Sequence, residues 1–241
     1  MANHVLADQL SFPRPLTTVD VAVFAVLDGK LHALLVERPG APDEPYPGRW
    51  ALPGGFVDLE RDPDLRSCAL RKVREKTGVA LPYLEQLGSW GGAKRDPRGW
   101  SATHVYFALI PVEPALHPGA NAADARWFPV GQTGVRLRLA FDHAEILAAA
   151  VGRLRNKVEY TSLPAFLLPR EFTLTELQHA YETVLGRRLE KSAFRTRVLT
   201  TDLVQRVDKV RAGANRPAQL YRLRNPAAPV YFPRTFSPRD E

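Results

Sequence analysis

The stretch from Leu52 to Val79 restricts the possible folds of this chain more than any other segment. It opens with the run Leu52-Pro53-Gly54-Gly55-Phe56, in which two glycines allow a tight turn. Apolar side chains then recur at positions 65, 69, 70 and 73, which is the spacing of one helical face, and Gly78 supplies a stop signal. The pattern predicts a helix over residues 65–77 that follows a glycine turn.

This segment resembles the Nudix box, the motif of hydrolases that cleave nucleoside diphosphates linked to another group. The box ends in Arg-Glu-U-x-Glu-Glu-x-Gly-U, where U is apolar. Lys72 and Lys76 occupy two of its glutamate positions, whereas five positions match: Arg71, Val73, Glu75, Gly78 and Val79. Arg71 lies 16 residues after Gly55, two more than in the family, and no acid stands eight residues before Arg71. The resemblance implies an α/β/α sandwich built around a mixed sheet.

The two lysines change the chemistry that the box can support. Mg²⁺ is a hard cation held by carboxylate oxygens and water, whereas an ammonium offers only hydrogen-bond donors and a like charge. Positions 72, 75 and 76 share one face of a helix, so the expected metal-binding face carries two cations and only one carboxylate, Glu75. We therefore expect no catalytic residues, no bound metal and no required cofactor. The alternative is an active hydrolase that combines Glu75 with a displaced acid such as Glu60 or Asp62.

The segments around this helix have the character of strands. Residues 19–27 and 31–38 are separated by Asp28-Gly29-Lys30, and Asp-Gly between two β-rich runs is a strong hairpin signal. Further strands are expected over residues 83–90, 102–110 and 125–129. Strands on both sides of one helix fit the sandwich that the resemblance implies.

A last helix of this first part is expected from Asp142 to about Asn156. The run Asp142-His143-Ala144-Glu145 has the form of a capping box, in which the aspartate side chain accepts a backbone N–H. Its apolar stripe consists of Ile146, Leu147, Val151 and Leu154. Residues 160–169 contain prolines at 164 and 169 and are interpreted as the connection between two domains.

Charge divides the 241 residues into two unequal parts. Residues 1–150 hold 16 Lys and Arg against 17 Asp and Glu, a net charge of −1, whereas residues 151–241 hold 17 against 9, a net charge of +8. We expect a Nudix-like ligand-sensing domain over 1–156, and a linker with a basic domain over 157–241. A basic domain beside a neutral one indicates a polyanionic partner, DNA or RNA. The alternative is that the charge serves solubility alone.

The basic part has the pattern of a winged helix-turn-helix. The run Thr173-Leu174-Thr175-Glu176 is a capping box, and apolar residues continue at helical spacing until Gly186. A second helix is expected over residues 191–200, with Phe194, Val198 and Leu199 facing inward. Two short strands over 204–211 and 219–223 then enclose a loop rich in turn residues. In such a domain the second helix enters the major groove, and the wing contacts the backbone or the minor groove.

Together the two halves resemble the Nudix-related transcriptional regulators, the NrtR family, over about residues 16–223. The resemblance implies a repressor of NAD or related nucleotide or sugar metabolism, whose degenerate Nudix domain senses ADP-ribose or a similar nucleotide. Helix-turn-helix proteins read palindromic operators as dimers, so we expect double-stranded DNA and a homodimer. A module that holds RNA or a protein is the remaining alternative.

Candidate residues for an ADP-ribose site follow from its chemistry. A diphosphate favours guanidinium groups and backbone N–H groups near glycines, and adenine favours an aromatic slot. The residues expected in this site are Arg38, Arg49, Trp50, Gly54, Gly55, Arg98 and Trp100. The six histidines have no metal-ligand spacing, and His104 and His143 are interpreted as structural or surface residues.

Candidate DNA contacts lie on the predicted second helix and on the wing. Phosphate contacts come from Lys, Arg and hydroxyl groups, and arginine also reads guanine. The expected residues are Lys191, Ser192, Arg195, Thr196, Arg197 and Arg216.

The remaining features concern the compartment. Cys68 is the single cysteine, which excludes an intramolecular disulfide, and it falls within an apolar helical pattern where a buried free thiol is expected. The apolar run 19–27 is interrupted by Asp20 and is too short to span a bilayer. We expect a cytoplasmic protein with no membrane partner.

Overall fold

A computed structural model describes residues 13–111, 116–117, 122–212, 217–233 and 235–236 of the chain. Its larger sheet has seven strands in the order β3-β2-β1-β6-β5, with β4 paired to β1 and β7 paired to β2. Only β1 and β6 run parallel among these pairs; the others are antiparallel. The strands are β1 (Leu16–Leu27), β2 (Lys30–Glu37), β3 (Trp50–Ala51), β4 (Gly54–Phe56), β5 (Tyr83–Gly92), β6 (Ser101–Leu109) and β7 (Asp124–Pro129).

The first hairpin forms as its sequence predicts. Leu27 pairs with Lys30, so the turn consists of Asp28 and Gly29, with φ angles of 48° and 69°. Two successive positive φ angles define the turn type that matches the twist of the strands and that favours Asp-Gly. The predicted strand segments over 83–90, 102–110 and 125–129 also form, each with bounds shifted by no more than two residues.

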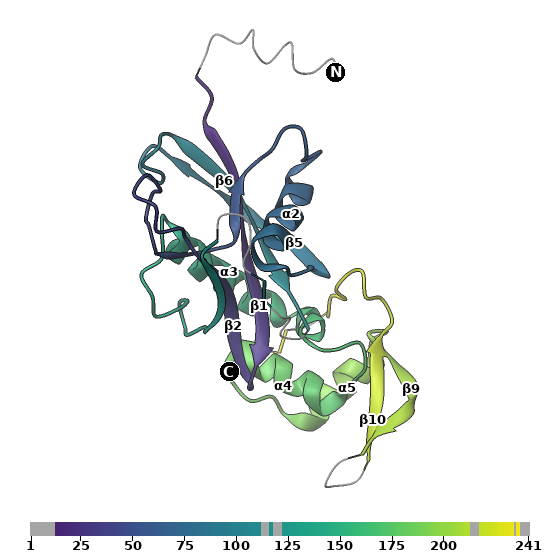
Figure 1. Cartoon of the computed structure of the whole chain (residues 1–241). Helices are drawn as coiled ribbons and strands as arrows, with labels where there is room; N and C mark the ends of the chain where they lie inside the picture. The colour runs from purple at the N-terminus through teal and green to yellow at the C-terminus, as the bar shows by residue number, and fades with distance from the viewer. Residues whose placement is uncertain (1–12, 112–115, 118–121, 213–216, 234, 237–241) are drawn as a thin grey trace.

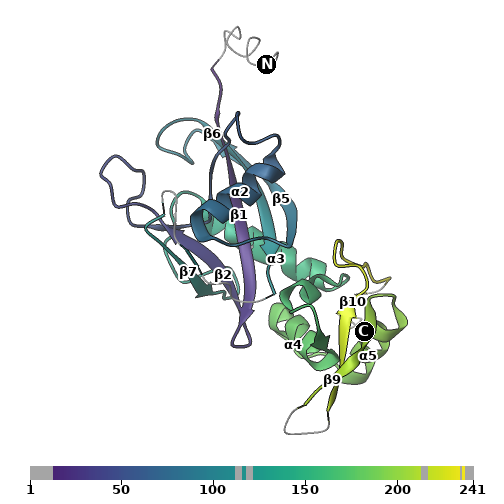
Figure 2. The same ribbon diagram turned by 45° about the vertical axis from the view of Figure 1, so that its right-hand side comes forward.

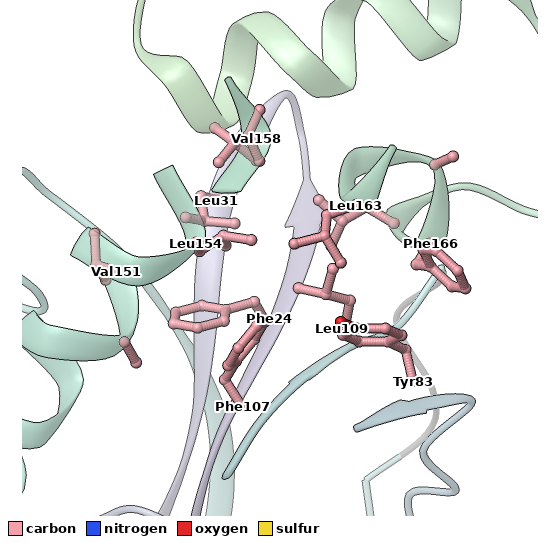
Figure 3. Packing of buried hydrophobic residues seen from close by; sticks show 14 of the residues in the cluster. Phe24, Leu31, Tyr83, Phe107, Leu109, Val151, Leu154, Val158, Leu163 and Phe166 are labelled. Atoms are coloured by element: carbon pink, nitrogen blue, oxygen red, sulfur yellow. The ribbon is translucent and has the colours of Figure 1, made fainter. Parts of the chain in front are cut away.

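Helices cover both faces of this sheet (Figure 1). On one face α2 (Leu65–Thr77) buries Cys68, Ala69 and Val73 against alternate residues of β1. On the other face α3 (His143–Val158) packs its apolar stripe against Phe24 and Phe107, as Figure 3 shows. Because successive side chains of a strand point to opposite faces, β1 supplies both layers. The predicted α/β/α sandwich with a mixed sheet is therefore confirmed.

A side chain caps the N-terminus of α2 but not that of α3. The Asp64 side chain caps α2 by accepting from Ser67 N at 2.7 Å, and Gly78, at a φ of 74°, ends the helix. The predicted side-chain cap of α3 is wrong. Asp142 makes no capping hydrogen bond, because both its carboxylate oxygens accept from the Arg95 guanidinium at 2.9 Å. The helix also continues two residues beyond the predicted end at Asn156.

The predicted winged helix-turn-helix also forms. Thr173 and Glu176 complete both halves of the capping box of α4 (Leu174–Leu185), and α5 (Lys191–Thr200) follows. The second sheet has the order β8-β10-β9 and consists of β8 (Phe172–Thr173), β10 (Ala218–Leu223) and β9 (Val204–Arg211). Phe194 and Val198 are buried, but Leu199 is 54% exposed, so the expectation that it faces inward is wrong.

The segment between the two units is part of the core and not a loose connection. Residues 163–167 form the 3-10 helix η1 (Leu163–Leu167), and all five side chains are buried. Figure 3 shows Leu163 and Phe166 of η1 close to Tyr83 and Leu109 of the sheet. One hydrophobic cluster extends from β1 through α3 and η1 to α5. Figure 2 shows α3 reaching from the sheet toward α4. None of the described helices is both long and apolar enough to cross a bilayer.

Candidate functional site

A cavity opens where α2, the glycine turn, the end of β2 and the loop before β6 meet. Its lining is rich in charged side chains and contains lysines and arginines from three separate parts of the chain. The lining residues are Thr18, Asp20, Val36, Arg38, Glu44, Ala51, Leu52, Gly54, Gly55, Phe56, Lys72, Glu75, Lys76, Arg95, Asp96, Arg98, Phe141 and His143.

Four of the seven residues expected at the ligand site line this cavity: Arg38, Gly54, Gly55 and Arg98. The other three lie elsewhere. Trp50 packs edge-on against Phe128 at a centroid distance of 4.7 Å. Arg49 lies over the ring of Tyr46, and Trp100 is 52% exposed beside Gly91. The structure therefore does not bring Arg49, Trp50 and Trp100 to the cavity.

Each cavity arginine is already engaged by a carboxylate. Arg38 pairs with Glu44 at 2.5 Å, and Arg98 pairs with Asp96 at 2.8 Å. Arg95 holds Asp142 and also lies 3.7 Å from Asp20. These pairs fix the guanidinium groups in place, and a ligand anion must share or displace the carboxylates.

Asp20 forms the buried polar centre of the cavity. Burial acts to raise its pKa, but His143, Thr103 and Arg95 together hold that pKa below its ordinary value. Thr103 donates its hydroxyl to Asp20 at 2.7 Å. Leu52 N donates to Nδ1 of His143 at 2.9 Å, and the other ring nitrogen, Nε2, lies 3.6 Å from Asp20. His143 is thus the structural residue that the sequence indicated, and it is also part of the cavity wall.

The two glycines are required by the geometry of β4. A side chain at Gly54 would collide with the Asp20 carboxylate and the Val19 carbonyl, because β4 lies directly against β1 here. Gly55 has a φ of 148°, a conformation that residues with side chains rarely adopt. The glycine turn therefore allows both the close strand contact and the open floor of the cavity.

The side chains of α2 that face the cavity are those expected to share a face. Lys72, Glu75 and Lys76 all line it. Glu75 is engaged by Arg61 at 2.7 Å and by Arg71 at 2.9 Å. Arg71 also holds Asp62 through two short hydrogen bonds. Within the described residues, no three His, Cys, Asp or Glu side chains converge as a metal site.

Aromatic walls come from two residues that the sequence did not indicate, Phe56 and Phe141. Arg98 lies over the Phe56 ring at 4.8 Å, and Arg38 lies over the Phe141 ring at 4.9 Å. Phe141 has a φ of 52°, an unusual conformation for a bulky residue, and such outliers often mark functional sites. Phe56 ends the glycine run of the Nudix-like motif but was not expected at the ligand site, whereas Phe141 stands in no recognisable motif and only the fold reveals it.

The residues of α5 that were expected to contact DNA differ in their exposure to solvent. Lys191, Ser192 and Thr196 are exposed. Arg195 and Arg197 are only partly exposed, and Arg197 is engaged by residues near the C-terminus. Its guanidinium lies 4.0 Å from the centroid of the Phe236 ring and donates to the Thr235 carbonyl at 2.8 Å. Arg216 lies outside the described residues.

Comparisons with known proteins cover both units. Residues 16–150 match the NUDIX domain, and residues 164–223 match the NrtR DNA-binding winged helix domain. The chain is 49% identical to the ADPR responsive transcriptional repressor NtrR of Acinetobacter baylyi, over 92% of this chain and 88% of that protein. The chain belongs to the NrtR family.

Solved structures of the NrtR family agree with this fold. Shewanella oneidensis NrtR complexed with a 27mer DNA is 39% identical, with a TM-score of 0.82 over 92% of this chain and 99% of that one. The NUDIX domain of the same protein complexed with ADP ribose is 38% identical, with a TM-score of 0.56 over 64% of this chain and 99% of that one. The match to the NrtR winged helix spans α4, α5, β9 and β10.

Proposed function

We propose that this NrtR-family chain is a transcriptional repressor that binds operator DNA through its winged helix and ADP-ribose through its Nudix cavity. The relative that supports this is described as an ADPR responsive repressor, and S. oneidensis NrtR is known bound to DNA and to ADP ribose. The regulated genes serve NAD or related nucleotide or sugar metabolism. The repressor acts as a homodimer on a palindromic operator, since two half-sites mirror protein symmetry.

The observation that carries the proposal is a cation-rich cavity whose carboxylates are already engaged. Arg38, Arg95 and Arg98 are preorganised by ion pairs, and a diphosphate can bind them by sharing or displacing the paired carboxylates. Phe56 and Phe141 offer aromatic faces for a base or a ribose. We assign these five residues, with Gly54 and Gly55, to the ADP-ribose site.

The same cavity argues against an enzyme. A hydrolase of this type needs several carboxylates free to hold Mg²⁺, but Glu75 is bound by Arg61 and Arg71. Asp62, one of the displaced acids considered above, is held by Arg71 with its side chain 1% exposed, and Glu60 lies exposed outside the cavity. The chain therefore binds the nucleotide without consuming it.

Helix α3 provides a physical connection between the two sites. His143 at its first turn lines the cavity, and Asp142 beside it is held by the cavity arginine Arg95. At the other end Arg155 donates to the Val184 carbonyl of α4 at 3.2 Å. The helix has 16 residues, a length of about 24 Å. A ligand that draws Arg95 away from Asp142 shifts this helix and the winged unit packed on it.

A titration of labelled operator duplex tests the proposal. The duplex is taken from upstream of the chain's own operon, and binding is followed by fluorescence anisotropy against a shuffled duplex and an RNA of the same sequence. We expect a preference for the operator that ADP-ribose changes about 5–150-fold, the usual range of coupling. AMP and ribose 5-phosphate serve as controls. Equal binding to all three nucleic acids, or no response to ADP-ribose, would contradict the proposal.

A turnover assay tests the non-enzymatic part separately. ADP-ribose is incubated with the protein and Mg²⁺ or Mn²⁺, and AMP release is measured. We expect no release above background. Turnover on the order of 1 s⁻¹, within the usual range for enzymes, would favour the hydrolase alternative.

A further inference from the structure

The donor set on α2 does not fit the divalent cation that the Nudix fold implies. A hard cation needs several free oxygen ligands, and this face carries one carboxylate between two ammonium groups. That carboxylate, Glu75, already accepts from Arg61 at 2.7 Å and from Arg71 at 2.9 Å. No step through a metal can be derived from these residues, so another group must compensate the charge of a bound diphosphate.

Lys72 and Lys76 differ from the other cations that line the cavity. The three arginines each have a carboxylate partner within 3 Å. By contrast, neither lysine makes an ion pair or a side-chain hydrogen bond within the part of the chain that the structure describes. They are therefore the cavity cations that an incoming anion can meet without displacing a carboxylate.

Both lysines line the cavity, and the Lys72 ammonium lies at the glycine turn. A Cβ added to Gly55 would lie 3.5 Å from Nζ of Lys72, so this ammonium lies beside the turn. Lys76 follows one helical turn later on the same face. Burial, together with the charges of Arg38 and Lys72, lowers the pKa of Lys76. An anion bound between these cations would stabilise the charged form.

We propose that Lys72 and Lys76 bind the diphosphate of a nucleoside diphosphate directly, in place of the divalent cation of a Nudix hydrolase. This inference rests on the proposed function and assigns the ligand's diphosphate to these two side chains. A diphosphate between two esters carries two negative charges at neutral pH, and two ammonium groups supply the same charge as one divalent cation. The cavity therefore selects the metal-free form of its ligand.

Calorimetric titrations of the full chain test this assignment. ADP-ribose is titrated in excess EDTA and again with Mg²⁺, and inorganic pyrophosphate in EDTA serves as a second probe. We expect wild-type affinity for ADP-ribose to be at least as high in EDTA as in Mg²⁺. Lys72→Met and Lys76→Met are each expected to weaken both ligands by about 10–100-fold, the range for charge-assisted hydrogen bonds. Lys94→Met is the matched control, because Lys94 is exposed and does not line the cavity.

The outcomes separate this inference from the proposed function. ADP-ribose binding that requires Mg²⁺, or that survives both lysine substitutions, overturns the inference and leaves the sensor intact. Lysine-dependent binding of pyrophosphate without any ADP-ribose binding supports the inference and refutes ADP-ribose as the effector. Absence of binding by either ligand overturns both. Operator binding by the unliganded variants, together with wild-type thermal unfolding, shows that a loss of ligand affinity is not a loss of fold.

Discussion

The substitution Phe236→Ala tests the contact between α5 and the C-terminal segment, residues 230–233 and 235–236. The Phe236 ring lies 5.1 Å from Tyr181 and 6.0 Å from Phe194, and the Arg197 guanidinium lies 4.0 Å from its centroid. Its backbone N–H donates to the Glu159 carbonyl at 2.9 Å. The segment thus links the end of α3 to α5, the helix expected to read DNA.

The expected loss of stability follows from these contacts. Truncating a fully buried Phe costs about 3–5 kcal/mol, and this ring is half-buried, so about 2 kcal/mol is expected from packing. The contact with the Arg197 guanidinium adds about 0.5–1 kcal/mol. A total of about 2–3 kcal/mol lowers the Tm of a chain of this size by about 4–12 °C. Thermal unfolding followed by circular dichroism measures this, with Tyr231→Ala as the control because Tyr231 is 61% exposed.

A double-mutant cycle isolates the cation–π contact. Phe236→Ala and Arg197→Ala are measured singly and together, in unfolding and in operator binding. We expect a coupling of about 0.5–1 kcal/mol in stability, because each single change removes the same contact. We also expect Phe236→Ala to weaken operator binding, since α5 loses support on its inner side. Effects that add within about 0.3 kcal/mol, or equal Tm values for the Phe236 and Tyr231 variants, would refute this reasoning.

Three further predictions follow from single contacts. Gly54→Ala should lower the free energy of unfolding in urea by about 1–3 kcal/mol, because the new Cβ would collide with the backbone of β1. Gly40→Ala is the control and should be near neutral, because no atom lies within 4 Å of a Cβ at that position. The hydrogen bonds from Arg71 hold the pKa of Asp62 well below its ordinary value of 3.8, so this ion pair stabilises the fold above pH 3.8 and is lost as the pH falls further. The loss of stability caused by Asp62→Asn should therefore shrink below pH 3.8, and a loss that does not depend on pH would contradict this. Lys191→Ala should weaken all duplexes alike and reduce the salt slope of binding by about one, and an unchanged slope would remove Lys191 from the phosphate contacts.

The elements that the sequence predicted are those fixed by local chemistry. The Asp28-Gly29 hairpin, the helix over 65–77 and the capping box of Thr173 and Glu176 each depend on residues within a few positions of one another. The same reasoning failed at Asp142, which has the same spacing to an acid as Thr173. Its carboxylate has a tertiary partner, Arg95, that lies 47 residues away, and this stronger pairing replaces the local cap.

The candidate site was only partly predictable, because several of its residues are distant from one another in the sequence. Gly54 and Gly55 stand in the Nudix-like motif, and Arg38 and Arg98 were expected because guanidinium groups bind a diphosphate; all four line the cavity. Asp20, Arg95 and Phe141 come from three distant segments, and only the fold brings them together. On α5, helical spacing identified the exposed Thr196 but not the position of Arg197, because the residues that engage it lie about 38 positions later.

The proposed role of Lys72 and Lys76 has consequences for both catalysis and sensing. A hydrolase that binds ADP-ribose through Mg²⁺ destroys the ligand, so its occupancy depends on turnover as well as on ligand concentration. Under the proposed function, in which the chain does not hydrolyse ADP-ribose, occupancy depends only on concentration and affinity, which is the condition for equilibrium linkage. Linkage then requires operator DNA to change ADP-ribose affinity by the same factor by which ADP-ribose changes operator affinity. The proposed function therefore combines the loss of a catalytic metal site with a helix, α3, that connects the cavity to the winged helix.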